Sequence, residues 1–164
     1  MRLGRIQNNY TAEGFDLAAA QGMEFIEICC NYDEDAQKLI AAQDDVKAQI
    51  ARTGIDVSCV GRWNHHVQHD GAIDAENAQL YYDLLDTAIA LGAKTFVCGC
   101  NYDESVSRYR NYTNAIAFFR GLIDRAAGRI KIAIQNCNWN NFVVSPHDWD
   151  VVLGELPELM IKFD

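Results

Sequence analysis

Short apolar segments alternate with longer amphipathic segments along the whole chain, and this alternation constrains its fold more than any other feature. Six segments have the length and apolar content of buried strands: 2–7, 24–30, 55–63, 94–100, 131–137 and 159–164. Between them, five segments place apolar side chains at helical spacing: 11–23, 33–54, 74–93, 107–128 and 145–156. Strict alternation of this kind predicts a parallel sheet whose strands are joined by right-handed helical crossovers.

Two architectures contain such a sheet, the open doubly wound fold and the (β/α)8 barrel. The sequence has neither a G-x-G-x-x-G motif after its first strand nor a phosphate-binding G-x-x-x-x-G-K-[ST] motif, which disfavours the open nucleotide-binding sheets. Several strands also end in polar residues, at 7–9, 62–66, 101 and 135–136. Barrel active sites form at these strand ends, so we predict an α/β fold of the TIM-barrel type.

The length of the chain bears on how much of a barrel it holds. A complete barrel needs about 250 residues, whereas this chain has 164. We therefore predict a single domain over residues 1–164 that contains strands one to six of a barrel, as a truncated or partly observed chain. An open sheet stays the alternative.

Composition and charge bear on partners and location. The formal net charge is −9 and the basic residues form no stripe, which argues against a nucleic-acid partner. No apolar run approaches the roughly 20 residues of a membrane span, and the N-terminus has no signal-peptide pattern. We expect a cytoplasmic protein whose six cysteines are reduced and packed as small apolar side chains.

Four stretches in sequence resemble a known family. They are GFDLAAAQGMEFIEI, GIDVSCVGRW, LDTAIALGAKTFVCG, and KIAIQNCNW followed by SPHDWDVVLGELPELMIKFD. In this order they resemble the xylose isomerase-like barrels of the sugar phosphate isomerase/epimerase family. The resemblance implies an enzyme that uses a divalent metal (Mn, Mg, Co or Zn) to move a proton next to a carbonyl. It also implies a small carbohydrate substrate, and it leaves a homo-oligomer open.

The resemblance also implies positions for the metal ligands. A Glu is expected at the end of strand five and an Asp at the end of strand six, with a His and a Glu from two further strands that this sequence lacks. Asp164 matches the strand-six ligand, but Gln135 stands at the strand-five position. An amide offers one oxygen to a hard cation but cannot act as a general base. We therefore expect weakened metal binding, which Gln135→Glu would strengthen.

Two charged residues are expected on the inner face of the barrel. Glu27 alternates with outward-facing isoleucines in its strand, and Lys162 shares the parity of Asp164. A buried carboxylate needs a partner, for which Arg62 and Lys162 are the candidates. We predict that Glu27 and Lys162 are catalytic, with a purely structural ion pair as the alternative for Lys162.

Further candidates for substrate binding lie at strand ends. The indole of Trp63 is suited to stack on a sugar ring, or else to cover the barrel rim. His65 and His66 are expected in a solvated loop, where one of them contacts substrate. The full set of predicted substrate-binding residues is Arg62, Trp63, His65, His66, Asn101 and Asn136.

Three functions follow from these observations. The leading hypothesis is a metal-dependent sugar or sugar-phosphate isomerase/epimerase. The second is a related lyase or dehydratase that acts on a sugar-derived substrate. The third is a sugar-binding barrel without catalysis, in which Gln135 marks a degraded metal site.

Overall fold

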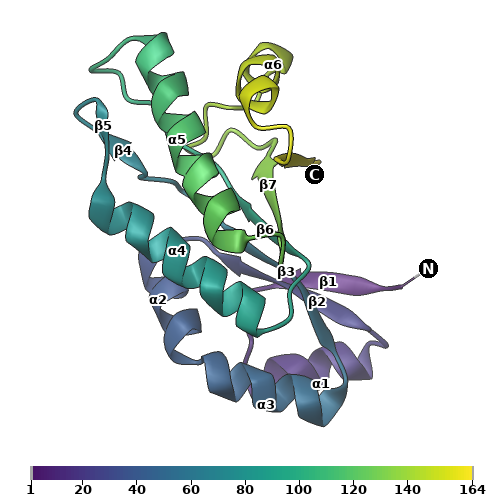
Figure 1. Cartoon of the computed structure of the whole chain (residues 1–164). Coiled ribbons are helices and arrows are strands. Elements are labelled where there is room, and N and C mark those ends of the chain that lie inside the picture. Colours follow the sequence, from purple (N-terminus) through teal and green to yellow (C-terminus); the bar gives the residue numbers. More distant parts are fainter. Residues whose placement is uncertain (1, 164) are drawn as a thin grey trace.

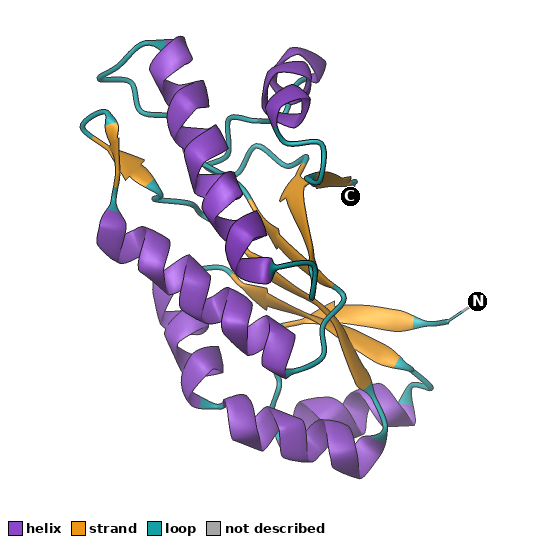
Figure 2. Cartoon of the chain, viewed as in Figure 1, coloured by secondary structure: helices purple, strands orange, loops and turns teal. Residues whose placement is uncertain are grey.

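The computed structural model describes residues 2–163 and contains one parallel sheet, drawn as orange arrows in Figure 2. The strands follow the order β1-β2-β3-β6-β7-β8, so the strands of this sheet pair in the order in which they occur in the chain. All six predicted strands are confirmed: β1 (Gly4–Gln7), β2 (Phe25–Cys30), β3 (Asp56–Arg62), β6 (Thr95–Cys98), β7 (Lys131–Gln135) and β8 (Met160–Lys162). Sequential parallel pairing is the pattern of a barrel wall and differs from the reversed strand order of a doubly wound sheet.

Helices follow the strands and cover one face of the sheet, which is curved (Figure 1). They are α1 (Ala12–Ala20), α2 (Asp33–Ala41), α3 (Gln43–Thr53), α4 (Ala75–Ala90), α5 (Arg108–Ala126) and α6 (Pro146–Glu155). The prediction of one helix over 33–54 was wrong, because the helix breaks at Ala42. The two halves pack on different neighbours, α2 against α4 and α3 against α1, and one straight helix would not reach both.

The two faces of the sheet bury different side chains. Ile132 and Ile134 of β7 belong to the large core under the helices. Ala133 of the same strand belongs to a small cluster on the other face, with Cys59 and Val97, against which Trp63 packs. This alternation confirms the predicted parity, so Gln135 lies on the inner face with Ala133.

A two-stranded hairpin after β3 was not predicted. Its strands are β4 (Gln68–His69) and β5 (Ala72–Ile73), which pair antiparallel. The turn between them is Asp70-Gly71, with φ of 49° and 76°. Both values are positive, as a type I′ turn requires, and Asp-Gly is the sequence signal for such a turn.

Two expectations drawn from composition can be compared with the structure. Five of the six cysteines are buried, as expected from packing, and no disulfide joins them within residues 2–163; Cys137 is the exposed one. Within residues 2–163, no helix combines the length and the apolar content needed to cross a membrane.

Candidate functional site

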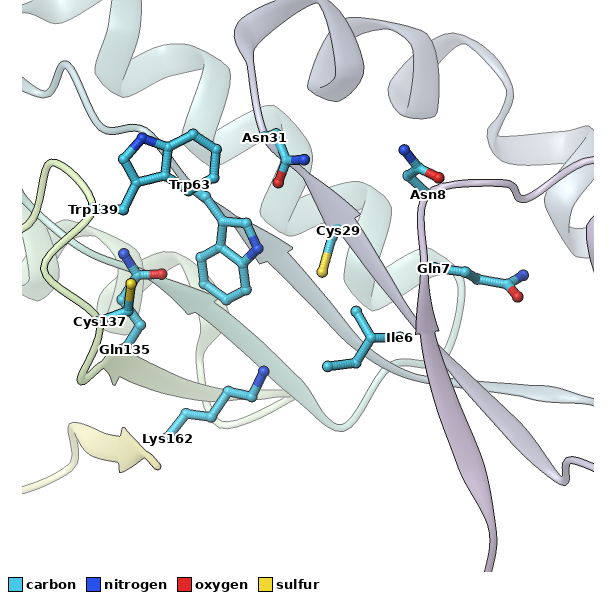
Figure 3. A pocket seen from close by; sticks show the side chains of 10 residues that line it. All are labelled: Ile6, Gln7, Asn8, Cys29, Asn31, Trp63, Gln135, Cys137, Trp139 and Lys162. Atoms are coloured by element: carbon cyan, nitrogen blue, oxygen red, sulfur yellow. The ribbon is translucent and has the colours of Figure 1, made fainter. Parts of the chain in front are cut away.

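A pocket of about 550 Å³ opens on the inner face of the sheet, at the carboxyl ends of the strands (Figure 3). Its walls come from the ends of β1, β2, β3, β7 and β8 and from the loops that follow them. The lining residues are Ile6, Gln7, Asn8, Cys29, Asn31, Trp63, Gln135, Cys137, Trp139 and Lys162. This is the end of the sheet at which barrels hold their ligands.

An ion pair between Lys162 and Glu27 lies at the base of this pocket. Lys162 Nζ donates a hydrogen bond of 2.6 Å to Glu27 Oε1, and the two side chains are 18% and 12% exposed. The ammonium also lies 5.3 Å from the centre of the Trp63 ring. Of the two candidate partners for Glu27, the structure selects Lys162. Lys162 itself lines the pocket, whereas Glu27 lies one layer deeper on β2 than Cys29.

Two tryptophans supply apolar surface to the pocket. Trp63 packs on the inner-face cluster, and Gly61 leaves the space for its indole, since a Cβ there would lie 2.9 Å from Trp63 Cζ2. Trp139, in the loop after β7, is 41% exposed and meets Tyr32 edge to face, with ring centroids 6.2 Å apart. Flat apolar faces beside amides suit a ligand that has both apolar and hydroxyl surfaces.

Gln135 is held from behind by His65. The Gln135 amide nitrogen lies 2.9 Å from His65 Nε2, and His65 Nδ1 lies 2.9 Å from the hydroxyl of Tyr81. Burial lowers the pKa of His65 well below its usual value, and the charges of Arg62 and His66 lower it further. The expectation that His65 lies in a solvated loop was wrong, because its side chain is 0% exposed.

Arg62 is buried away from the main pocket. Its Nη1 donates to the carbonyl oxygens of Asn31, at 2.9 Å, and of Trp63, while Nη2 pairs with Asp33. The guanidinium also lies 5.7 Å from the centre of the Tyr81 ring. These contacts connect the ends of β2 and β3, so Arg62 supports the rim on which Asn31 and Trp63 stand.

The remaining predicted substrate contacts lie outside the pocket. Asn101 is buried, and its Oδ1 accepts from the backbone amides of Val67 and Gln68 at 2.6 and 3.1 Å, which fixes the loop before the hairpin. His66 lines a separate pocket of about 240 Å³ together with Arg62. Asn136 donates its backbone N–H to the carbonyl oxygen of Lys162, at 3.2 Å. None of these three side chains lines the pocket of about 550 Å³ on the inner face.

Comparison with known proteins establishes the family of this chain. The model of the xylose isomerase-like TIM barrel family matches residues 15–164, which is most of the chain. The chain belongs to this family. No curated protein sequence matches the chain.

Solved structures share the fold of this xylose isomerase-like barrel at low sequence identity. They include D-allulose 3-epimerase from Methylomonas sp. (TM-score 0.75, 20% identity) and 3-keto-D-glucoside 4-epimerase YcjR from E. coli (TM-score 0.72, 16% identity). The 3-DHS dehydratase AsbF from Bacillus anthracis is similar too (TM-score 0.69, 13% identity). The matches cover 99–100% of this chain but 67% of YcjR and 63% of the other two, so the chain spans about two thirds of their length.

The described residues of this xylose isomerase-like barrel do not fit a divalent metal by themselves. No group of three or more His, Cys, Asp or Glu side chains within residues 2–163 is placed to hold one. Gln135 would supply a single neutral oxygen, and the ammonium of Lys162 on the same pocket would repel a cation. The other predicted ligand, Asp164, lies outside the described residues.

Several pocket residues were missed from the sequence. Asn8 and Asn31 line the pocket and directly follow β1 and β2. Polar residues at strand ends were the reason for selecting Asn101 and Asn136. The same criterion applied to every strand would have selected Asn8 and Asn31 too. Trp139 and Cys137 lie in the amide-rich loop after β7. Cys137 shares the inward parity predicted for Gln135, two residues before it, whereas nothing in the local sequence distinguishes Trp139 from a solvent-facing side chain.

Proposed function

We propose that this barrel is a sugar isomerase or epimerase and that the pocket lined by Trp63, Trp139 and Lys162 binds its carbohydrate substrate. The observation that carries the proposal is the ammonium of Lys162, held by Glu27 at 2.6 Å and 5.3 Å from the face of Trp63, at the carboxyl ends of the strands. Similarity to two sugar epimerases supports it.

The chemistry follows from the charge that develops during such a reaction. Transfer of a proton from a carbon next to a carbonyl to a base, for which the described lining offers the thiolate of Cys29 or Cys137, places negative charge on the carbonyl oxygen. An ammonium in a partly buried site stabilises that charge more than water does. Lys162 is the catalytic residue in this scheme, because it lines the pocket. Glu27 acts through Lys162 and is a positioning residue, which holds the ammonium in place at the pocket.

A non-catalytic sugar-binding barrel is the second candidate. The observation that favours it is the composition of the pocket: among the ten described lining residues there is no carboxylate and no histidine. A carbon acid needs a base within hydrogen-bonding reach of its proton, and beside the ammonium of Lys162 these residues offer only the thiols of Cys29 and Cys137.

Product analysis on the full-length protein tests the proposal. D-Fructose and D-allulose are each incubated with the wild type and with Lys162→Met, and the sugars are separated by chromatography. The proposal expects interconversion by the wild type and a loss of about 100-fold or more in the variant, the magnitude typical of removing one charge-stabilising donor. If the protein binds D-fructose or D-allulose but converts neither these sugars nor any other ketose or aldose in a panel, the result supports the second candidate.

A further inference from the structure

Three buried side chains from distant parts of the chain form a hydrogen-bonded row behind the pocket. Gln135 ends β7, His65 follows β3, and Tyr81 lies on α4; they are 1%, 0% and 2% exposed. The Tyr81 ring is fixed in turn by Phe118, edge to face at 5.2 Å. Gln135 is the only member of the row among the described residues that line the pocket.

The proton arrangement in this row follows from the side of the Gln135 amide that faces His65, which is the nitrogen. An amide nitrogen carries only donors, so Gln135 Nε2 donates to His65 Nε2, which must be unprotonated. The ring proton is then on Nδ1, which donates to the Tyr81 hydroxyl at 2.9 Å. The backbones on either side are fixed as well: Asn140 Nδ2 donates to the His65 carbonyl oxygen, and Asn141 Nδ2 donates to the Gln135 carbonyl oxygen at 2.9 Å.

The consequence concerns the other end of the Gln135 side chain. With the amide nitrogen committed to His65, the amide oxygen is the polar atom left to face the pocket (Figure 3). A rotation of the amide by 180° would turn its oxygen toward Nε2, and the ring proton would then have to move to Nε2 while the Tyr81 hydroxyl donates to Nδ1. The direction of the row, read from the tautomer of His65, therefore determines which end of the amide a ligand meets.

We propose that His65 is a positioning residue that presents the Gln135 amide oxygen to the pocket, where it accepts a hydrogen bond from one hydroxyl of the substrate. The choice of a hydroxyl as the donor rests on the proposed carbohydrate function, whereas the orientation of the amide does not. A buried acceptor left without a donor costs about 1–3 kcal/mol. A sugar that lacks this hydroxyl should therefore bind roughly 10-fold to 100-fold more weakly.

The row also predicts what happens to the proton of His65 when Gln135 is replaced by Glu, the residue that the family resemblance implies at position 135. In Gln135→Glu a carboxylate would face His65 Nε2, and two acceptors would meet unless the ring moves its proton to Nε2. The Tyr81 hydroxyl can follow this change by donating to Nδ1, because a hydroxyl both donates and accepts. Gln135→Glu should therefore reverse the direction of the row.

Nitrogen NMR of the full-length protein, labelled with ¹⁵N-histidine, tests the orientation without any substrate. At neutral pH the wild type should show a histidine with its proton on Nδ1, assigned to His65 by the loss of its signal in His65→Gln. Gln135→Glu should move the signal to the Nε2-protonated form, while Gln37→Glu on the exposed face of α2 should leave it unchanged. A wild-type His65 that is protonated on Nε2, or on both nitrogens, would overturn the assigned orientation.

Calorimetry with a sugar and its monodeoxy analogues tests the contact itself. The wild type should bind one analogue at least 10-fold more weakly than the parent, and Gln135→Met should bind the parent and that analogue equally. Gln37→Met is the matched control and should keep the discrimination. If Gln135→Met discriminates as the wild type does, the hydroxyl contact is wrong. A wild type that binds no sugar overturns the proposed function and the hydroxyl contact together, and the NMR result still decides the orientation.

Discussion

Lys162 of β8 and Glu27 of β2 form an ion pair of 2.6 Å across the inner face of the sheet. The strands that carry them are not neighbours, because β3, β6 and β7 lie between them in the sheet. Adjacent strands lie about 4.8 Å apart, so a flat sheet would hold these side chains far from each other. The pair therefore forms only when the sheet is curved as a barrel wall is.

Removing either member of this pair should destabilise the protein. Glu27→Leu and Lys162→Met each leave one partly buried charge without its partner, and we expect each to lower the free energy of unfolding by about 3 kcal/mol. The double variant leaves no unpaired charge, so it should cost less than the sum of the two single changes. Urea denaturation of the full-length protein measures all three variants.

An exposed ion pair is the control for this cycle. Arg52 and Asp16 pair at 2.7 Å with side chains 47% and 59% exposed, so Arg52→Met should cost less than about 1 kcal/mol. Additive effects of Glu27→Leu and Lys162→Met would show that the two side chains do not interact in solution.

Glycine at position 99 should be needed for the row behind the pocket. A Cβ on Gly99 would lie 2.6 Å from Asn141 Cγ and 2.7 Å from His65 Nε2, and both neighbours are buried. Gly99→Ala should therefore lower the free energy of unfolding by about 2 kcal/mol, because the new Cβ forces Asn141 and His65 apart. Gly154→Ala, inside α6, is the control. A Cβ at Gly154 meets nothing within 4 Å, so helix propensity should raise the free energy of unfolding of this variant by up to about 1 kcal/mol. Thermal unfolding of both variants compares them, and equal effects would contradict the close packing at Gly99.

Burial of neutral His65 should make stability depend on pH. Because burial lowers the pKa of His65 in the folded state, the unfolded chain binds the proton first, below about pH 6.5. The contribution of the neutral ring is complete above that pH and is lost as the pH falls. Between pH 7 and pH 5 the free energy of unfolding should fall by about 2 kcal/mol from this group.

Two histidine variants separate His65 from other titrating groups. His65→Gln should remove this part of the pH dependence, whereas His69→Gln should keep it, because His69 is on the exposed side of the hairpin. Urea denaturation at several pH values gives the comparison. A wild type and a His65→Gln variant with the same slope would show that His65 is not held neutral.

Trp139 should contribute to ligand affinity but little to folding. Its side chain is 41% exposed and lines the pocket, so its apolar face is available to a sugar ring. Trp139→Ala should weaken sugar binding by roughly fivefold to tenfold through lost apolar burial. Tyr109→Ala, which removes an aromatic ring that is 80% exposed on α5, should leave affinity unchanged. Equal affinities of Trp139→Ala and wild type in calorimetry would remove Trp139 from the binding site.

The sequence predicted the strands, most helices and the inward parity of Gln135, because these depend on local alternation of apolar and polar residues. It did not predict the break at Ala42 or the burial of His65. Both depend on contacts between distant segments: α2 and α3 choose different neighbours, and His65 meets Gln135 seventy residues away. Local patterns hold no information on such pairings.

For the candidate catalytic residues too, some features could be predicted from the sequence and others could not. The inward positions of Glu27 and Lys162 could be predicted from strand parity, but their pairing required the curvature of the sheet. Arg62 was a candidate for the same role by its charge, although it shares strand parity with Val60 on the helix side. The structure places it against Asp33 and Tyr81 instead, because its strand end meets the start of α2 and the inner turn of α4.

Solvent exchange at carbon tests the central claim most directly. The full-length protein is incubated with D-fructose or D-allulose in ²H₂O, and proton NMR follows the hydrogen on the carbon next to the carbonyl. If Lys162 stabilises the oxyanion formed by proton loss, the wild type should replace this hydrogen with deuterium, and Lys162→Met should do so at least about 100-fold more slowly. A wild type that binds these sugars without any exchange, or a Lys162→Met variant that exchanges as fast as the wild type, would contradict the account.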